Sequence, residues 1–393
     1  MERLRVKLLA YPAADAQVFS KAKRRLQKLF RQEIVEFVDK DPEVLVFLSG
    51  GSERIALQSV QEYGFYLLIA SDIDNAWAAA TEVKAWMNQN NVTSILVDQN
   101  SDEAIELVED LFKVKNGIKR LKGMRFGLVG EVSDWLVNSS IDPFVIKTKL
   151  GIDQVNIPWE TINIAEHKNI SADFLNFFDN PSTPNKKDIL GSGQIYEVLS
   201  DVVRSYKLNA LTVECFSLLQ KCNATACLAL SKLSMDGVPA GCEGDTCSML
   251  GMMIAKELFG IVPWIANTSF VDPNKQQVIF SHCTVPANLL KDFELDTHFE
   301  SGKGLAIKGS LKAETVTILR FDHTLSKMFV REGTVETTMN KKGMCRTQLK
   351  VNVDESAIDY FMNNPLGNHH LIIPGDFTLG FELAARMLKM ILV

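Results

Sequence analysis

Short apolar runs alternate with helical patterns through the N-terminal third of the sequence, and this alternation constrains the fold more than any other feature. The runs are rich in Val, Leu and Ile, and apolar residues at helical spacing follow each of them. Repeated strand and helix patterns favour a doubly wound parallel sheet, because each helix returns the chain to begin the next strand beside the last. The expected strands are 6–11, 44–48, 66–70 and 94–97, and the expected helices are 16–31, 52–63, 74–90 and 102–117.

The pattern predicts three domains, since 393 residues are too many for one ordinary core. A polar, glycine-containing segment separates an N-terminal α/β domain (1–118) from a central α/β domain (119–273), and both are expected to be Rossmann-like. Beyond Asp272 strand patterns follow one another with little helix between them, which indicates a mostly antiparallel, β-rich C-terminal domain (274–393). The expected fold class is therefore α/β with a β-rich C-terminal part.

Composition and charge exclude several classes of function. Hydrophobic residues make up 46% and charged residues 23%, as in soluble globular proteins. No apolar run approaches the roughly 20 residues that cross a bilayer, and the N-terminus lacks the apolar block of a signal peptide. We therefore expect a cytoplasmic protein without a membrane partner. The net charge of −6 argues against a nucleic-acid partner, and the sequence contains neither of the glycine-rich nucleotide motifs.

The seven cysteines all lie beyond residue 214, and their odd number does not suit a disulfide framework. Reduced, mostly buried thiols are expected. Cys222 with Cys227 and Cys242 with Cys247 are each separated by four residues instead of the two typical of zinc knuckles. Their spacing therefore does not predict a structural zinc site.

Carboxylates and histidines stand beside predicted strand ends in the second half of the chain. Glu243 follows a short apolar run and precedes a helix rich in Met and Leu, Asp272 and His282 flank the next strands, and a histidine pair occupies 369–370. Taken singly, each has a simpler interpretation as a helix N-terminal charge, a turn residue or a buried histidine. Taken together, oxygen ligands with one or two imidazoles favour Mn²⁺, Mg²⁺ or Fe²⁺ over zinc, with Mn²⁺ the first expectation.

Four short segments carry a family resemblance. They are Glu-Gly-Asp at 243–245, Phe-Val-Asp at 270–272, Ser-His-Cys at 281–283 and Gly-Asn-His-His at 367–370. This succession resembles the L-fucose isomerase and L-arabinose isomerase superfamily, and the shorter fucose-isomerase-like proteins most of all. The resemblance covers about the last 180 residues. It implies a metal-dependent isomerase of a small sugar, assembled as a homo-oligomer, either a trimer or a hexamer.

Carried over residue by residue, the resemblance implies that Glu243 and Asp272 bind the metal and also act as the acid/base pair, with no ranking of which is the base. His282 is a ligand by analogy with the arabinose enzymes. The last ligand is His370 or His369, a choice that the motif leaves open. The residues expected to contact the substrate, because they neighbour these ligands, are Trp264, Asn267, Asn368 and His369.

The chemistry of these groups leads to one main hypothesis and two alternatives. Interconversion of an aldose and a ketose moves a proton between C1 and C2, which requires that the charge of an enediolate be stabilised. A metal-dependent aldose-ketose isomerase is therefore the leading hypothesis. A metal-dependent lyase or epimerase that uses the same enediolate, or a non-catalytic sugar-binding relative, is the alternative. The sequence does not identify the sugar, and phosphorylated or sulfonated sugars remain candidates.

Overall fold

The chain divides into two compact units. The computed structural model describes residues 1–61, 63–164, 167, 169–179, 186–222 and 224–393. The first unit holds Met1–Asn116 and Leu379–Lys389, and the second holds Gly117–Thr378 and Met390–Val393. The expected boundary after residue 118 lies next to this division, whereas the expected boundary after residue 273 falls inside the second unit. The central sheet and the β-rich part therefore form one compact body.

The first unit is built on a five-stranded parallel sheet in the order β2-β1-β3-β4-β5. All four residues of β3 are buried, which explains why this strand is continuously apolar instead of alternating with polar residues. The strands are β1 (Leu4–Leu9), β2 (Val35–Phe37), β3 (Val44–Phe47), β4 (Phe65–Ala70) and β5 (Thr93–Asp98), and the helices are α1 (Ala16–Leu29), α2 (Glu53–Leu57), α3 (Ala76–Gln89), α4 (Asp102–Leu121) and α12 (Thr378–Met387). The parallel sheet expected from the sequence is confirmed.

The second unit begins with a four-stranded parallel sheet in the order β7-β6-β8-β9. Its strands are β6 (Arg125–Val129), β7 (Asp153–Ile157), β8 (Ala210–Val213) and β9 (Ala240–Cys242), and its helices are α5 (Pro143–Leu150), α6 (Ala172–Phe178), α7 (Lys186–Ser205), α8 (Cys215–Cys222), α9 (Cys227–Met235) and α10 (Thr246–Phe259). In a parallel sheet of this kind the carboxyl ends of the strands share one edge. The ends of β8 and β9 accordingly bring Val213 and Cys242 into register.

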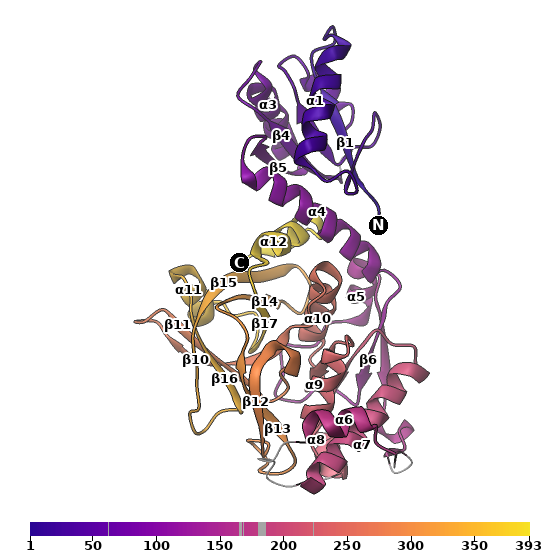
Figure 1. Ribbon diagram of the computed structural model, residues 1–393, viewed down its shortest axis with the longest axis vertical. Coiled ribbons are helices and arrows are strands. Elements are labelled where there is room, and N and C mark those ends of the chain that lie inside the picture. Colours follow the sequence, from indigo (N-terminus) through magenta and orange to yellow (C-terminus); the bar gives the residue numbers. More distant parts are fainter. Residues whose placement is uncertain (62, 165–166, 168, 180–185, 223) are drawn as a thin grey trace. The chain divides into compact units, whose positions relative to one another are not determined.

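Six antiparallel strands of the same unit close into a barrel, because β14 pairs with both β17 and β15. The ring runs β14-β17-β10-β11-β16-β15, and β18 pairs in parallel with β15. A separate hairpin of β12 and β13 belongs to the same unit (Figure 1). The elements are β10 (Trp264–Asp272), β11 (Gln277–His282), β12 (Leu290–Asp296), β13 (Ala306–Leu311), β14 (Thr315–Phe321), β15 (Lys327–Thr338), β16 (Thr347–Asn352), α11 (Glu355–Asn363), β17 (His369–Pro374) and β18 (Ile391–Leu392). The expected antiparallel, barrel-like part is confirmed, and it starts before residue 274.

Helix α10 joins the parallel sheet to the barrel. It packs on β8 and β9 on one side and on β14 and β17 on the other, which explains why it is apolar around most of its circumference. At Gly251 a Cβ atom would lie 2.4 Å from the Leu371 side chain, so the helix approaches β17 as closely as its backbone allows. Among the described residues, no helix combines the length and the apolar character that crossing a membrane requires.

Strand β17 turns its two histidines to opposite faces, as the alternation of a strand requires. His370 lies among Phe280, Phe329 and Phe361. Its Nδ1 donates to the Asn368 carbonyl (3.1 Å), and its Nε2 accepts from the Tyr360 hydroxyl (2.9 Å). Complete burial lowers the pKa of His370 to about 3, so the ring is neutral. His370 is therefore a hydrogen-bonded core residue.

The buried imidazole of His370 makes stability fall on acidification. The unfolded chain binds a proton there at about pH 6.5, whereas the folded chain binds it only near its pKa of about 3. Between these pH values the unfolded state therefore binds more protons than the folded state. The free energy of unfolding falls by about 1.4 kcal/mol for each pH unit below the unfolded pKa. Urea unfolding at several pH values between about 6 and 4 measures the free energy of unfolding. This free energy should fall less steeply with decreasing pH in His370→Gln than in the wild type. Equal slopes would contradict the assignment.

Candidate active site

The site begins at a strained turn after β9. Glu243 has a φ of 61° and Gly244 a φ of 70°, and a non-glycine residue in this region carries a conformational cost. Three hydrogen bonds hold the turn: Ser133 N donates to Glu243 O (3.0 Å), Gly244 N to Val213 O (3.1 Å), and Asp245 N to Cys242 O (3.2 Å). The strained backbone aims the Glu243 side chain away from the strand direction.

The carboxylate of Glu243 faces two imidazoles and an indole. Its Oε2 accepts a hydrogen bond from Trp135 Nε1 (2.6 Å), while its Oε1 lies 3.6 Å from His282 Nε2 and 3.9 Å from His369 Nε2. Burial by itself raises the pKa of Glu243, but the imidazoles of His282 and His369 and the Trp135 N–H outweigh burial and lower that pKa to about 2. Glu243 is therefore a carboxylate throughout the neutral pH range.

Both imidazoles turn Nε2 toward this carboxylate. His369 Nδ1 lies 2.9 Å from Asp245 Oδ2, and His282 Nδ1 lies 3.1 Å from the Thr284 hydroxyl. Because an ionised carboxylate only accepts, His369 donates from Nδ1 to Asp245. Neither Nε2 finds a hydrogen-bond partner among the described residues, although both are buried. Imidazole nitrogens and a carboxylate are donors of the kinds that bind divalent cations.

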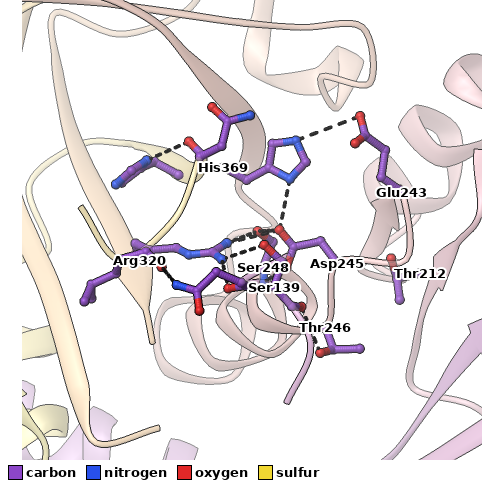
Figure 2. A network of polar contacts seen from close by, with 12 residues as sticks. Ser139, Thr212, Glu243, Asp245, Thr246, Ser248, Arg320 and His369 are labelled. Atoms are coloured by element: carbon purple, nitrogen blue, oxygen red, sulfur yellow. Dashed lines mark hydrogen bonds and ion pairs between the residues drawn. The ribbon is translucent and has the colours of Figure 1, made fainter. Parts of the chain in front are cut away.

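Asp245 orients His369 through a buried ionic network, which Figure 2 shows. Its Oδ1 caps α10 by accepting from Ser248 N (2.7 Å), and its Oδ2 lies 3.0 Å from Arg320 Nη1 as well as 2.9 Å from His369 Nδ1. The side chains of Asp245, Arg320 and His369 are all essentially inaccessible to solvent. Burial alone raises the pKa of Asp245, but Arg320 and His369 reverse this effect and hold it well below its usual range.

Arg320 extends the network to the loop that carries Trp135. Its Nη2 donates to the Asn138 carbonyl (3.2 Å) and to the Ser139 hydroxyl (2.8 Å). Thr246, at the start of α10, also donates to Ser139 O (3.1 Å). Barrel strand β14, helix α10 and this loop therefore share one buried guanidinium. No local sequence signal predicted Arg320 or Trp135, because their partners are distant along the chain.

The structure does not bring Asp272 or His370 to Glu243. Asp272 pairs with Gln277 at the hairpin end of β10 and β11, five residues along β10 from Asn267, which pairs with Ser281 beside His282. At about 3.3 Å per residue, Asp272 is remote from that end, and its carboxylate instead accepts from Asn274 N (3.2 Å) and Lys275 N (3.3 Å). Alternation along β17 sends His370 into the barrel, so His369 is the histidine of this pair that faces Glu243.

The structure places the other residues expected to contact the substrate in two different environments, the barrel core and the neighbourhood of the site. Trp264 is fully buried in the barrel core and is not available to a substrate, which corrects the expectation from its neighbours in sequence. Asn267 and Asn368 lie together, since Asn368 Nδ2 donates to Asn267 Oδ1 (2.5 Å). Asn267 pairs with His369 across β10 and β17, so both amides lie near the site.

Cysteines gather on one side of Glu243. A small pocket is lined by Glu243 and His282 and by five of the seven cysteines, namely Cys215, Cys227, Cys242, Cys283 and Cys345. Among the described residues, the donor atoms of Cys242, Glu243 and His282 form a group whose members lie within 4.8 Å of one another. The sequence predicted buried thiols but not this convergence, because the cysteines come from segments that are far apart along the chain.

Comparison with known proteins points to sugar isomerases. No protein-family model matches the chain. Sulfoquinovose isomerases of Priestia aryabhattai and Priestia megaterium are each 24% identical over 296 residues, which is 70% of this chain and 65% of the relative. That of Alkalicoccus urumqiensis is 24% identical over 240 residues, 57% of this chain and 54% of the relative. The matched part thus covers less than two thirds of each relative, and the resemblance to fucose and arabinose isomerases stays a prediction.

Removing the charge of Asp245 should unpair Arg320 and destabilise the second unit. Asn caps helices as well as Asp does, so Asp245→Asn can keep the bond to Ser248 N while it loses the charge and the acceptor oxygen that faces Arg320 and His369. We expect a loss of about 3–5 kcal/mol in the free energy of unfolding, because a buried guanidinium remains without its counter-ion. Asp354→Asn is the matched control, since Asp354 caps α11 by accepting from Ala357 N (2.7 Å) at an exposed position. Equal small losses in both variants, measured by urea unfolding, would contradict a stabilising role for the ion pair.

Proposed function

We propose that this chain is a divalent-metal-dependent isomerase that interconverts an aldose and a ketose. The observation that carries the proposal is the pair of buried Nε2 atoms of His282 and His369, which have no hydrogen-bond partner among the described residues and face the ionised carboxylate of Glu243. The names of the relatives supply the reaction class. A cation held by Glu243, His282 and His369 would satisfy both nitrogens, and Asp245 would act as the outer carboxylate that fixes the ring of His369.

When bound, a divalent cation would neutralise the negative charge that develops on the oxygens of an open-chain sugar during proton transfer. The residues of the chain prepare the site for this role. Glu243 supplies the negative charge, Trp135 fixes one of its two oxygens, and Asp245 and Thr284 orient the two imidazoles. These contacts hold the groups in place without a substrate, which favours a preorganised electrostatic site.

Glu243 is also our candidate for moving the proton between the two carbons. The sequence paired it with Asp272, but the observed position of Asp272 leaves Glu243 as the carboxylate of that pair at the site. We propose that His298 transfers protons to and from the sugar oxygens. His298 lines the same pocket, and its Nε2 lies 3.1 Å from Glu300 Oε2. Burial lowers the pKa of His298, so its neutral ring can accept a proton.

The relatives suggest the first substrate to test. Their name specifies sulfoquinovose, so we propose a sulfonated sugar of this kind as the substrate class. A homo-oligomer, trimer or hexamer, remains part of the proposal through the resemblance of the motifs.

Incubation of the metal-loaded protein with sulfoquinovose and a panel of aldoses in D₂O tests the reaction class. An isomerase forms the ketose and incorporates deuterium at C2 of the recovered aldose, because the transferred proton exchanges with solvent. Product analysis by NMR and mass spectrometry detects both. Fragments would assign the chain to the lyases, inversion without ketose to the epimerases, and binding without turnover to non-catalytic sugar-binding proteins. Each of those three results rejects the isomerase.

Substitution of the two carboxylates separates the sequence expectation from the structure. Glu243→Gln should lower kcat by about 10²- to 10⁴-fold, the range expected for loss of a proton-transfer group. Asp272→Asn is isosteric, keeps the turn at the hairpin and should leave kcat within about twofold of the wild type, as surface substitutions usually do. Steady-state rates of both variants with saturating metal provide the measurement. A large loss in Asp272→Asn, or wild-type activity in Glu243→Gln, would contradict the proposed site.

A further inference from the structure

Two cysteines meet in the wall of the pocket beside Glu243. Cys242 ends β9, and Cys215 begins α8 two residues after the end of the neighbouring strand β8. Their Sγ atoms lie 2.7 Å apart. This distance is shorter than the contact of two non-bonded sulfur atoms and only a little longer than the sulfur–sulfur bond of about 2.0 Å. A small movement of either side chain would therefore join the two sulfurs.

The two thiols differ in their exposure to solvent. Cys215 is partly exposed, whereas Cys242 is buried. An oxidant in solution therefore reaches Cys215 first, and Cys242 is the neighbouring thiol that can complete a bond to it. Cysteines that sense oxidants combine these two properties, because an accessible sulfur reacts first and a second thiol beside it then forms the disulfide.

We propose that Cys215 and Cys242 form a site of reversible oxidation, which a peroxide converts into a disulfide. In the first step the Cys215 sulfur takes one oxygen atom from hydrogen peroxide, so that a sulfenic acid forms and one molecule of water leaves. In the second step the Cys242 sulfur attacks the Cys215 sulfur, and the hydroxyl leaves with the thiol proton of Cys242 as a second molecule of water. The two thiols lose two electrons, and the peroxide accepts them. A dithiol reverses the change by thiol–disulfide exchange and is itself oxidised to a disulfide.

The new bond would act on Glu243 from two directions. Cys242 directly precedes Glu243, whose backbone is already strained at a φ of 61°. Cys215 directly precedes Phe216, whose ring packs edge-on against Trp135 with the ring centroids 4.9 Å apart. Trp135 Nε1 in turn donates to Glu243 Oε2 (2.6 Å). A shift at either cysteine therefore reaches the Glu243 carboxylate.

The oxidised form should be the less active one. This consequence rests on the proposed function, in which Glu243 binds the cation and moves the proton. Displacement of a reacting group by about 1 Å can cost about 10²-fold in rate. We therefore expect oxidation to lower kcat by about 10- to 100-fold and reduction to restore it. The disulfide itself forms or fails to form whatever reaction the site performs.

Mapping of the thiols tests the inference without reference to activity. The full-length protein is reduced with a dithiol, freed of the reductant and treated with a small molar excess of hydrogen peroxide. Free thiols are then alkylated, and mass spectrometry of the digested protein locates any disulfide. We expect a disulfide between Cys215 and Cys242, and the return of both thiols when the dithiol is added again.

Two variants serve as comparisons. In Cys215→Ser this disulfide cannot form, and Cys242 should remain a thiol at the same dose of peroxide because it is buried. Cys222→Ser is the matched control, since Cys222 is also partly exposed, ends the same helix α8 and is not among the residues that line the pocket. It should form the disulfide as the wild type does.

The emission of Trp135 reports whether the bond reaches the site. It is taken as the difference in fluorescence between the wild type and Trp135→Phe, and it should change on oxidation and recover on reduction. Peroxide treatment that leaves both cysteines as thiols, or that joins other cysteines instead, would overturn the inference. Oxidation of Cys215 only to the sulfinic acid would overturn it as well, because that product is not reversible by a dithiol.

The two proposals fail in distinguishable ways. Isomerase turnover in a protein that forms no disulfide between Cys215 and Cys242 would sustain the proposed function and reject the site of oxidation. A reversible disulfide that changes the Trp135 emission in a protein that turns over no sugar would sustain the site of oxidation and reject the proposed function. An active protein whose kcat is the same with and without the disulfide would reject the effect of oxidation on Glu243.

Discussion

The buried contact between Arg320 and Asp245 holds the candidate site together. Removing two charges from water is costly, and this pair repays the cost only through the additional hydrogen bonds that it makes. Asp245 also caps α10 and orients His369, while Arg320 also binds the loop that carries Trp135. Barrel, helix and loop are therefore positioned by one charge pair, and loss of either charge would affect all three.

The site lies where two different sheets meet. The parallel sheet supplies Glu243 at the end of a strand, as expected for ligand sites in open α/β sheets, and the barrel supplies His282 and His369 from two antiparallel strands. Helix α10 packs against both sheets and begins at this junction. The strained turn at Glu243 therefore faces donors from the barrel on one side and thiols of the parallel-sheet part on the other.

Much of the fold was predictable because the hydrophobic period is a local property. The parallel strands near residues 44–48 and 66–70 were found within one residue of their observed ends. Strand β2 has three residues and was missed, since so short a run gives no periodic signal. Of the site residues that the sequence singled out, the structure brings Glu243, His282 and His369 together. The sequence could not exclude Asp272 or choose between the two histidines, because strand register and the direction of each side chain depend on pairing with distant residues. Arg320 gave no local signal for the same reason.

Anomalous diffraction from crystals grown with Co²⁺ tests the central claim most directly. The claim is that residues from a parallel sheet and a barrel converge on one cation. We expect a single strong anomalous peak within about 2.0–2.3 Å of a Glu243 oxygen and of Nε2 of both His282 and His369. A map without a peak between these three side chains, or with the strongest peak at Asp272, would contradict the account.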